Sequence, residues 1–283
     1  TVLGGSLKKP AAAKVADDVE AHFAKMPDPV LSALEKPEAI FVTGVGGTGI
    51  VTVGAILAMA AHLENKGVTT MDQTGLAQKG GAVTSHIRIA KTPEDIKTVR
   101  IDVAGATAII GADLLVTADG GSLAKIRCGE TKVILNTYKA PTGEFTRKPE
   151  WDIPGGSIEE TVGKLAGKEN LFTLNATHIA TALMGDSIAA NMFMLGFAYQ
   201  KGLVPVSQEA IMKAIELNAA AVKMNQQAFI WGRRAAFDLK KVEELTAPPK
   251  AADGSDRHRE LSTSLDEIIA RRVASLTSYQ SAA

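Results

Sequence analysis

The chain has 283 residues, of which 46% are hydrophobic, 22% charged and 5% aromatic, enough for one large or two modest domains. Thirty-one Lys and Arg balance thirty-one Asp and Glu, so the chain lacks the basic excess of nucleic-acid-binding proteins. The longest apolar run, residues 51–61, is far shorter than the roughly 20 residues that span a bilayer. We therefore expect neither a nucleic-acid partner nor a membrane span. No secretory signal is visible, so the expected location is cytoplasmic.

The first 38 residues are rich in Ala, Lys and Pro and predict a helical extension or linker, with an amphipathic helix over 10–26. From residue 39 onward, short apolar runs alternate with helical stretches. Strands are expected over 39–43, 68–71, 83–89, 114–118, 133–136 and 171–174, and helices are expected over 48–66 and after the capping pair Ser157 and Glu160. This alternation predicts an α/β fold: a Rossmann-like, mostly parallel sheet with flanking helices.

The chain becomes helical after Asn175, with helices expected over 176–184, 188–200 and 208–229. A polar linker containing Pro follows over 246–256, and 265–279 predicts a last amphipathic helix. We divide the chain into an N-terminal extension (1–38), a Rossmann-like domain (39–240), and a linker with a C-terminal helix (241–283).

A glycine-rich loop follows the first expected strand. Gly44, Gly46 and Gly49 satisfy G-x-G-x-x-G, with Gly47 and Thr48 between them, at the opening of a helix. Such a loop lets an anion approach backbone N–H groups. Asp72 comes after the second strand, where a dinucleotide-binding domain places a ribose-binding carboxylate. The same loop also suits close packing of helix on strand, or contact with a neighbouring subunit, so the motif leaves these alternatives open.

A second loop contains Gln78, Lys79, Gly80 and Gly81 between the second and third strands. Its long polar side chains favour recognition of a ligand or partner at the sheet edge over a plain flexible connection. Asp119 either faces the glycine loop across a switch point or caps a helix, and capping is the preferred interpretation. The five histidines are scattered and Cys128 is alone, so no metal site and no catalytic residue are expected.

Several blocks resemble one known family. They are 44–52, the Gln78–Gly81 run with the strand after it, and 189–196 around Asn191. Together they resemble the γ domain of 2-oxoacid:ferredoxin oxidoreductases over roughly residues 39–240. Lys79, where other branches usually carry Arg, and the C-terminal tail look most like the long-chain indolepyruvate ferredoxin oxidoreductases.

The resemblance implies a Rossmann-like γ portion without catalytic residues, packed against other domains or subunits. Those partners would hold thiamine diphosphate with Mg²⁺ and [4Fe-4S] clusters, while this chain alone would hold no cofactor. The complete enzyme, expected as a homodimer of the whole unit, would decarboxylate a 2-oxoacid such as indolepyruvate oxidatively. It would use coenzyme A and yield an acyl-CoA, CO₂ and reduced ferredoxin.

A second hypothesis keeps the glycine loop in its simplest role. In it the chain is a free-standing NAD(P)-binding protein that uses Gly44, Gly46, Gly49 and Asp72. The helical half offers it no acid or base as a partner in hydride transfer.

Overall fold

The computed structural model describes residues 17–75, 80–140, 152–247, 262 and 264–280. Within these ranges a six-stranded sheet has the order β2-β3-β1-β4-β5-β6. The strands are β1 (Glu38–Val45), β2 (Gly67–Thr74), β3 (Ala82–Ala90), β4 (Ala108–Gly111), β5 (Lys132–Asn136) and β6 (Leu171–Leu174). Neighbours from β1 to β6 are parallel, and only β3 runs antiparallel to both its neighbours. The prediction of a mostly parallel α/β sheet is confirmed.

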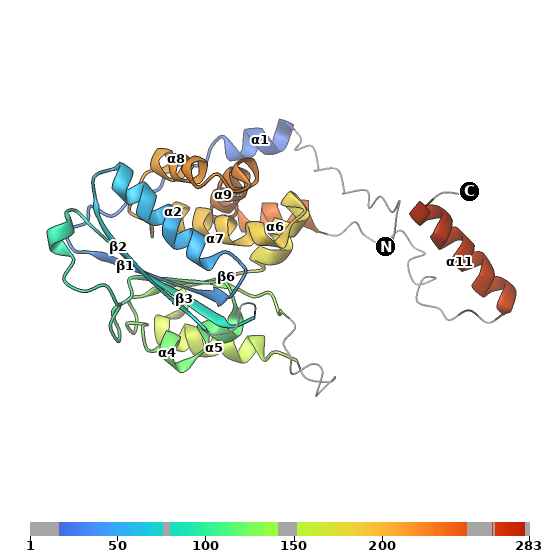
Figure 1. Ribbon diagram of the computed structural model, residues 1–283, viewed down its shortest axis with the longest axis horizontal. Coiled ribbons are helices and arrows are strands. Elements are labelled where there is room, and N and C mark those ends of the chain that lie inside the picture. The colour runs from blue at the N-terminus through green and yellow to red at the C-terminus, as the bar shows by residue number, and fades with distance from the viewer. Residues whose placement is uncertain (1–16, 76–79, 141–151, 248–261, 263, 281–283) are drawn as a thin grey trace.

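Helices cover both faces of the sheet (Figure 1). On one face lie α2 (Ile50–Leu63), α6 (Ala176–Met184), α7 (Ala190–Gln200), α8 (Gln208–Asn218) and α9 (Val222–Phe237). The other face carries α4 (Gly120–Leu123) and α5 (Gly155–Ala166), with α3 (Leu114–Thr117) packed among the same buried residues. The remaining elements are α1 (Asp17–Phe23), α10 (Leu239–Thr246), α11 (Leu265–Gln280) and the 3-10 turns η1 (Pro93–Asp95), η3 (Lys168–Asn170) and η4 (Ser187–Ala189).

Alternate side chains of β1 belong to two different hydrophobic cores, one on each face of the sheet. Ile40 and Val42 belong to the larger cluster beneath α2 and α7, whereas Ala39 and Phe41 belong to the smaller cluster beneath α5. Successive side chains of a strand point to opposite faces, so a run of apolar residues serves both layers. This double burial explains why the middle residues of the central strands, 39–42, 108–110 and 133–135, are all apolar.

Three local predictions were wrong. Residues 114–118 were expected as a strand, but the strand is Ala108–Gly111, and Asp113 caps the helical turn that follows by accepting the Val116 N–H at 2.9 Å. The stretch 208–229 is not one helix, because the chain turns through Ala219 and Ala221 with φ of +57° and +44°. Helix α5 begins at Gly155, before the expected cap Ser157.

Candidate functional site

The glycine loop joins the end of β1 to α2 by a tight reversal. Gly47 and Gly49 have φ of +87° and +89°, in the left-handed region that side chains disfavour. A Cβ on Gly44 would lie 2.4 Å from Ile50 Cδ1, so the missing side chain lets the helix pack closely on the strand. The Thr48 hydroxyl donates to the Val45 carbonyl at 2.7 Å. Two glycines therefore serve the turn and a third serves close packing.

The N-terminus of α2 opens onto this loop without a side-chain cap. Its N-cap is Gly49, no side chain accepts from the first turn, and the first turn contains no acidic residue. The first N–H groups of a helix lack intrahelical partners and carry the positive end of its dipole. The arrangement is electrostatically compatible with an anion or a carbonyl oxygen.

The end of the second loop is hydrogen-bonded to the glycine loop. Gly46 N–H donates to the Gly81 carbonyl at 2.7 Å, and Gly80 N–H donates to the Gly46 carbonyl at 3.5 Å. The contact follows from the β1–β3 pairing, which sets Val45 opposite Ala82. Gln78 and Lys79 lie outside the described residues.

Asn191 reaches the same place from α7. A Cβ on Gly49 would lie 3.1 Å from Asn191 Nδ2, and Asn191 is buried. The fold thus brings together the glycine loop, Gly80, Gly81 and Asn191, three segments far apart in the sequence.

A cavity of about 660 Å³ lies at the carboxyl ends of β1, β4 and β5. The chain leaves β1 toward one side of the sheet and continues with β4 on the other, which makes this the switch point where α/β folds bind ligands. Its polar lining comes from the glycine loop, the N-caps of α3 and α4, the end of β5 with the residues after it, η4, and the first turns of α6 and α7: Thr48, Asp113, Asp119, Asn136, Tyr138, Thr177, Ser187 and Asn191.

The two carboxylates of this cavity act as helix caps. Asp119 Oδ2 accepts the Gly121 N–H at 2.9 Å, as Asp113 Oδ1 accepts that of Val116. Asp119 lines the cavity together with Thr48, so both interpretations offered for it hold at once. No Lys or Arg lines the cavity in the described part of the chain.

Asn136 is a cavity residue that sequence reasoning missed. Its Nδ2 donates to the Ala112 carbonyl at 3.0 Å and to the Thr177 hydroxyl at 2.8 Å, which ties β5 to the loop after β4 and to α6. A signal was available, because Asn136 ends a run of buried apolar residues at the carboxyl edge of the sheet.

A second cavity, of about 610 Å³, lies on the other side of the glycine loop. It is bounded by residues of that loop, the first turn of α2, the end of β2 and η4: Gly46, Gly47, Gly49, Val51, Thr74, Gly75 and Ile188. The glycine loop therefore borders both cavities, and α2 begins directly after it.

Asp72 does not join this site. It lies inside β2, opposite Ser85 of β3, and is exposed. Because β3 separates β2 from β1, Asp72 stands one strand spacing, roughly 4.8 Å, farther from the glycine loop than it would in a sheet where β2 adjoins β1. The geometry does not support its expected role beside a dinucleotide ribose.

Among the described residues, His86 of β3 has the most strongly shifted pKa, and it lines neither cavity. Burial is the main cause that lowers its pKa to about 4, and the positive charges of Lys125, Arg100 and Arg88 lower it further. Its Nδ1 accepts the Ile101 N–H at 3.0 Å, so the neutral ring carries its proton on Nε2. His86 is thus a neutral hydrogen-bond acceptor that anchors the connection to β4.

The described ranges contain no group of three or more His, Cys, Asp or Glu side chains placed to hold a metal ion. No helix within them has both the length and the apolarity needed to cross a membrane.

Comparison with known families decides the membership of the chain. A family model described as "Pyruvate ferredoxin/flavodoxin oxidoreductase" matches residues 39–235. The chain belongs to this family. Indolepyruvate oxidoreductase subunit IorB of Archaeoglobus fulgidus is 32% identical, over 70% of this chain and 98% of the relative. The pyruvate/ketoisovalerate oxidoreductases common subunit gamma of Pyrococcus furiosus is 33% identical, over 71% of this chain and 96% of the relative.

Solved structures of the family share the fold. The γ subunit of a keto/oxoacid ferredoxin oxidoreductase from Geobacter sulfurreducens is 22% identical, with a TM-score of 0.50, and the match covers 71% of this chain and 98% of that one. The 2-oxoglutarate:ferredoxin oxidoreductase of Magnetococcus marinus has a TM-score of 0.51 at 18% identity, but there the match covers 72% of this chain and only 31% of the other. The fold thus occurs both as a separate subunit and as part of a longer chain.

These findings confirm the expected γ portion of a 2-oxoacid:ferredoxin oxidoreductase, a subunit of an enzyme complex. They do not favour the alternative of a free-standing NAD(P)-binding protein, against which the displaced Asp72 also stands.

Proposed function

We propose that this chain is the γ portion of an indolepyruvate or related arylpyruvate ferredoxin oxidoreductase, with CoA as the acyl acceptor and ferredoxin as the electron acceptor. The observation that carries the proposal is the convergence of the glycine loop, Gly80, Gly81 and Asn191 beside the switch-point cavity. We propose that these residues, with Thr48, Gln78 and Lys79, line the approach of CoA and the contact with the partner domains.

The reactive groups are assigned to the partners. Fe–S clusters of this kind take four thiolates, and the chain has one cysteine. We therefore place the [4Fe-4S] clusters in other domains or subunits of a unit that we expect to be dimeric. The family resemblance places thiamine diphosphate with Mg²⁺ there as well. A single cysteine also agrees with the reducing cytoplasm, where we place the complex.

The partners are also the expected place of substrate choice. By its name, the Pyrococcus furiosus relative is a subunit common to pyruvate and ketoisovalerate oxidoreductases, so in that organism one γ chain is shared by two enzymes. We propose the same division here: the γ portion supports the CoA half of the reaction, and the thiamine-binding domains select the side chain of the 2-oxoacid.

The test is turnover of the complex purified with its natural partners. Indolepyruvate should support CoA-dependent ferredoxin reduction with a higher kcat/KM than pyruvate or 2-oxoglutarate. In the same complex, Lys79→Ala should raise the KM for CoA several-fold and leave the KM for the 2-oxoacid unchanged, since a lost ammonium weakens binding of the CoA phosphates. Lys91→Ala, at an exposed lysine after β3, is the matched control and should change neither constant.

Two results would contradict the proposal. If Lys79→Ala and Lys91→Ala give equal KM values for CoA, the second loop has no role in CoA binding. If the chain binds NADH at micromolar concentration and Asp72→Ala abolishes that binding, the NAD(P) hypothesis replaces the present one.

A further inference from the structure

Helix α2 has an outer face that is unusual for a surface helix. The whole helix, Ile50–Leu63, contains no Asp, Glu, Lys or Arg. One side packs on the sheet, but Val51, Met59 and Leu63 on the other side remain 42%, 39% and 42% exposed. Ala55 and His62 are exposed among them, and His62 is the only polar residue of this exposed set. A helix face turned to water normally carries charged residues. This face has the composition of a surface covered by another protein.

Strand β2 lies beneath the same helix and forms an open edge of the sheet. All eight of its residues pair with β3 on one side, and no described strand pairs with the other. Edge strands are usually protected by Lys, Pro or a bulge. β2 contains no Lys and no Pro, keeps a regular register with β3 throughout, and has Asp72 as its one charged residue.

We infer that a second copy of this chain covers this surface, with β2 paired antiparallel to β2 of the second copy and the two α2 helices meeting above the joined sheets. A partner that extends the sheet here must offer a free edge strand and, beside it, an uncharged helix on the same face. This chain carries both, side by side. A two-fold axis perpendicular to the sheet places β2 against β2 and α2 against α2 of the second copy. The absence of Lys, Arg, Asp and Glu from α2 means that no like charges oppose each other between the helices.

The symmetry also restricts the register. Residues directly opposite each other must point to the same face of the sheet. The two-fold axis therefore passes midway between one residue and the same residue of the second copy, and these two residues face each other across the pair. The two central choices are Thr70 and Met71. With Thr70 on the axis, Asp72 faces Val68 of the second copy, and with Met71 on the axis it faces Thr70. Either register gives each carboxylate an uncharged neighbour.

The proposed function already includes a dimeric unit. This inference goes further by naming the surface through which two copies of the chain meet, and its test involves no turnover. The full chain is measured by light scattering after size-exclusion chromatography at several concentrations. We expect a mass of twice 29.6 kDa. Met59→Glu should weaken dimerisation at least tenfold, because it buries a carboxylate in an apolar contact. The control Leu165→Glu replaces a side chain of similar exposure (36%) on α5, across the sheet, and should leave the dimer intact.

A cysteine trap tests the register directly. In a Cys128→Ser background, Thr70→Cys or Met71→Cys should form a disulfide-linked dimer on mild oxidation, since residues opposite each other across an antiparallel pair have Cα atoms about 4.5–5.5 Å apart. Val99→Cys, exposed in the connection between β3 and β4, should not. A chain that is monomeric at every concentration, or a dimer that neither Met59→Glu weakens nor the traps link, would overturn the inference. Circular dichroism confirms that each variant is folded before its mass is interpreted.

Discussion

His86 illustrates how far one residue can depart from what its sequence context indicates. The alternation of β3 places it among the polar positions of a half-buried strand, yet it is 1% exposed. The β2 and β1 strands flank it, its ring centroid lies 4.8 Å from that of Phe41, and the Ile101 N–H fills its Nδ1. The ring stays neutral because burial disfavours its charged form, and because protonation would also place a charge next to Lys125, Arg100 and Arg88.

The lowered pKa of His86 predicts a specific pH dependence of stability. The unfolded chain titrates near 6.5 and the folded one near 4, so the unfolded state binds more protons between these values. The contribution of His86 to the free energy of unfolding should be fully present above pH 6.5. It should decline as the pH drops to 4, by up to about 3 kcal/mol. Thermal unfolding followed by circular dichroism from pH 7.5 to 4 measures the decline.

Two variants separate this effect from general acid sensitivity. His86→Asn keeps an oxygen near Nδ1 to accept the Ile101 N–H but does not titrate, so its melting temperature should fall less steeply with pH. His178→Asn, at an exposed histidine of α6, should follow the wild type. Equal slopes for His86→Asn and wild type would show that His86 does not control the decline.

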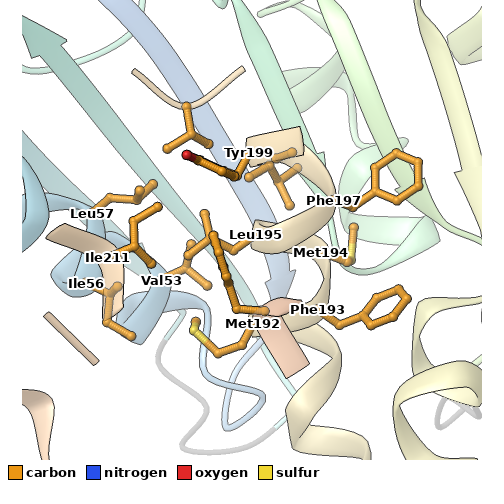
Figure 2. Packing of buried hydrophobic residues seen from close by; sticks show 14 of the residues in the cluster. Val53, Ile56, Leu57, Met192, Phe193, Met194, Leu195, Phe197, Tyr199 and Ile211 are labelled. Carbon is orange, nitrogen blue, oxygen red and sulfur yellow. The ribbon is translucent and has the colours of Figure 1, made fainter. Parts of the chain in front are cut away.

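At the scale of elements, the crossing of α7 and α9 holds the helical layer together. Residues Ala190–Tyr199 of α7 are all buried. Figure 2 shows Met192 and Leu195 turned toward Val53, Ile56 and Leu57 of α2 and Ile211 of α8, while Phe193, Met194 and Phe197 point to the other side of the helix. The Met and Phe residues of 192–197, interpreted from the sequence as core or interface packing, lie in this core. The crossing is possible because Gly196 and Gly232 let the two backbones touch.

Gly196→Ala should therefore destabilise the protein although alanine favours helices. Its Cβ would lie 1.9 Å from the Phe229 carbonyl oxygen, a backbone atom that moves only if the helices separate. We expect a loss of roughly 1–3 kcal/mol or more, measured by urea unfolding. Gly156→Ala in α5, where a Cβ meets nothing within 4 Å, should be neutral or stabilise by up to about 1 kcal/mol. Similar midpoints for both variants would contradict this account.

At the scale of the whole molecule, α11 stands apart from the two cores. Figure 1 shows it away from the α/β body, and neither core cluster includes a residue of it. Its apolar stripe is exposed, from 45% at Ile268 to 70% at Leu265. A single helix of this length is marginal in water, so we propose that α11 docks on a partner domain or subunit and not on its own α/β body.

Deletion of residues 257–283 tests this placement. The melting temperature of the truncated chain should match that of the full chain within about 1 °C, because no described core contact is lost, while co-purification with the partner subunits should fail. A large drop in melting temperature would show that the helix folds back on its own domain. Leu276→Asp offers a milder version, which should weaken the assembly and leave unfolding unchanged.

Sequence alone determined the α/β class, the strands at 39–43, 133–136 and 171–174, and the family, because these depend on local periodicity and on a motif read in chain order. It could not separate the strand Ala108–Gly111 from the apolar turn after it, since both runs are short and hydrophobic and only pairing with β1 and β5 distinguishes them. Asp72 had the correct spacing for a ribose carboxylate. The strand order places Asp72 one strand farther from the glycine loop, because β3 lies between β1 and β2. The meeting of Gly49, Gly81 and Asn191, the cap roles of Asp113 and Asp119, and the neutrality of His86 are likewise consequences of tertiary structure. They depend on distances between residues far apart in the chain, which side-chain pattern does not encode.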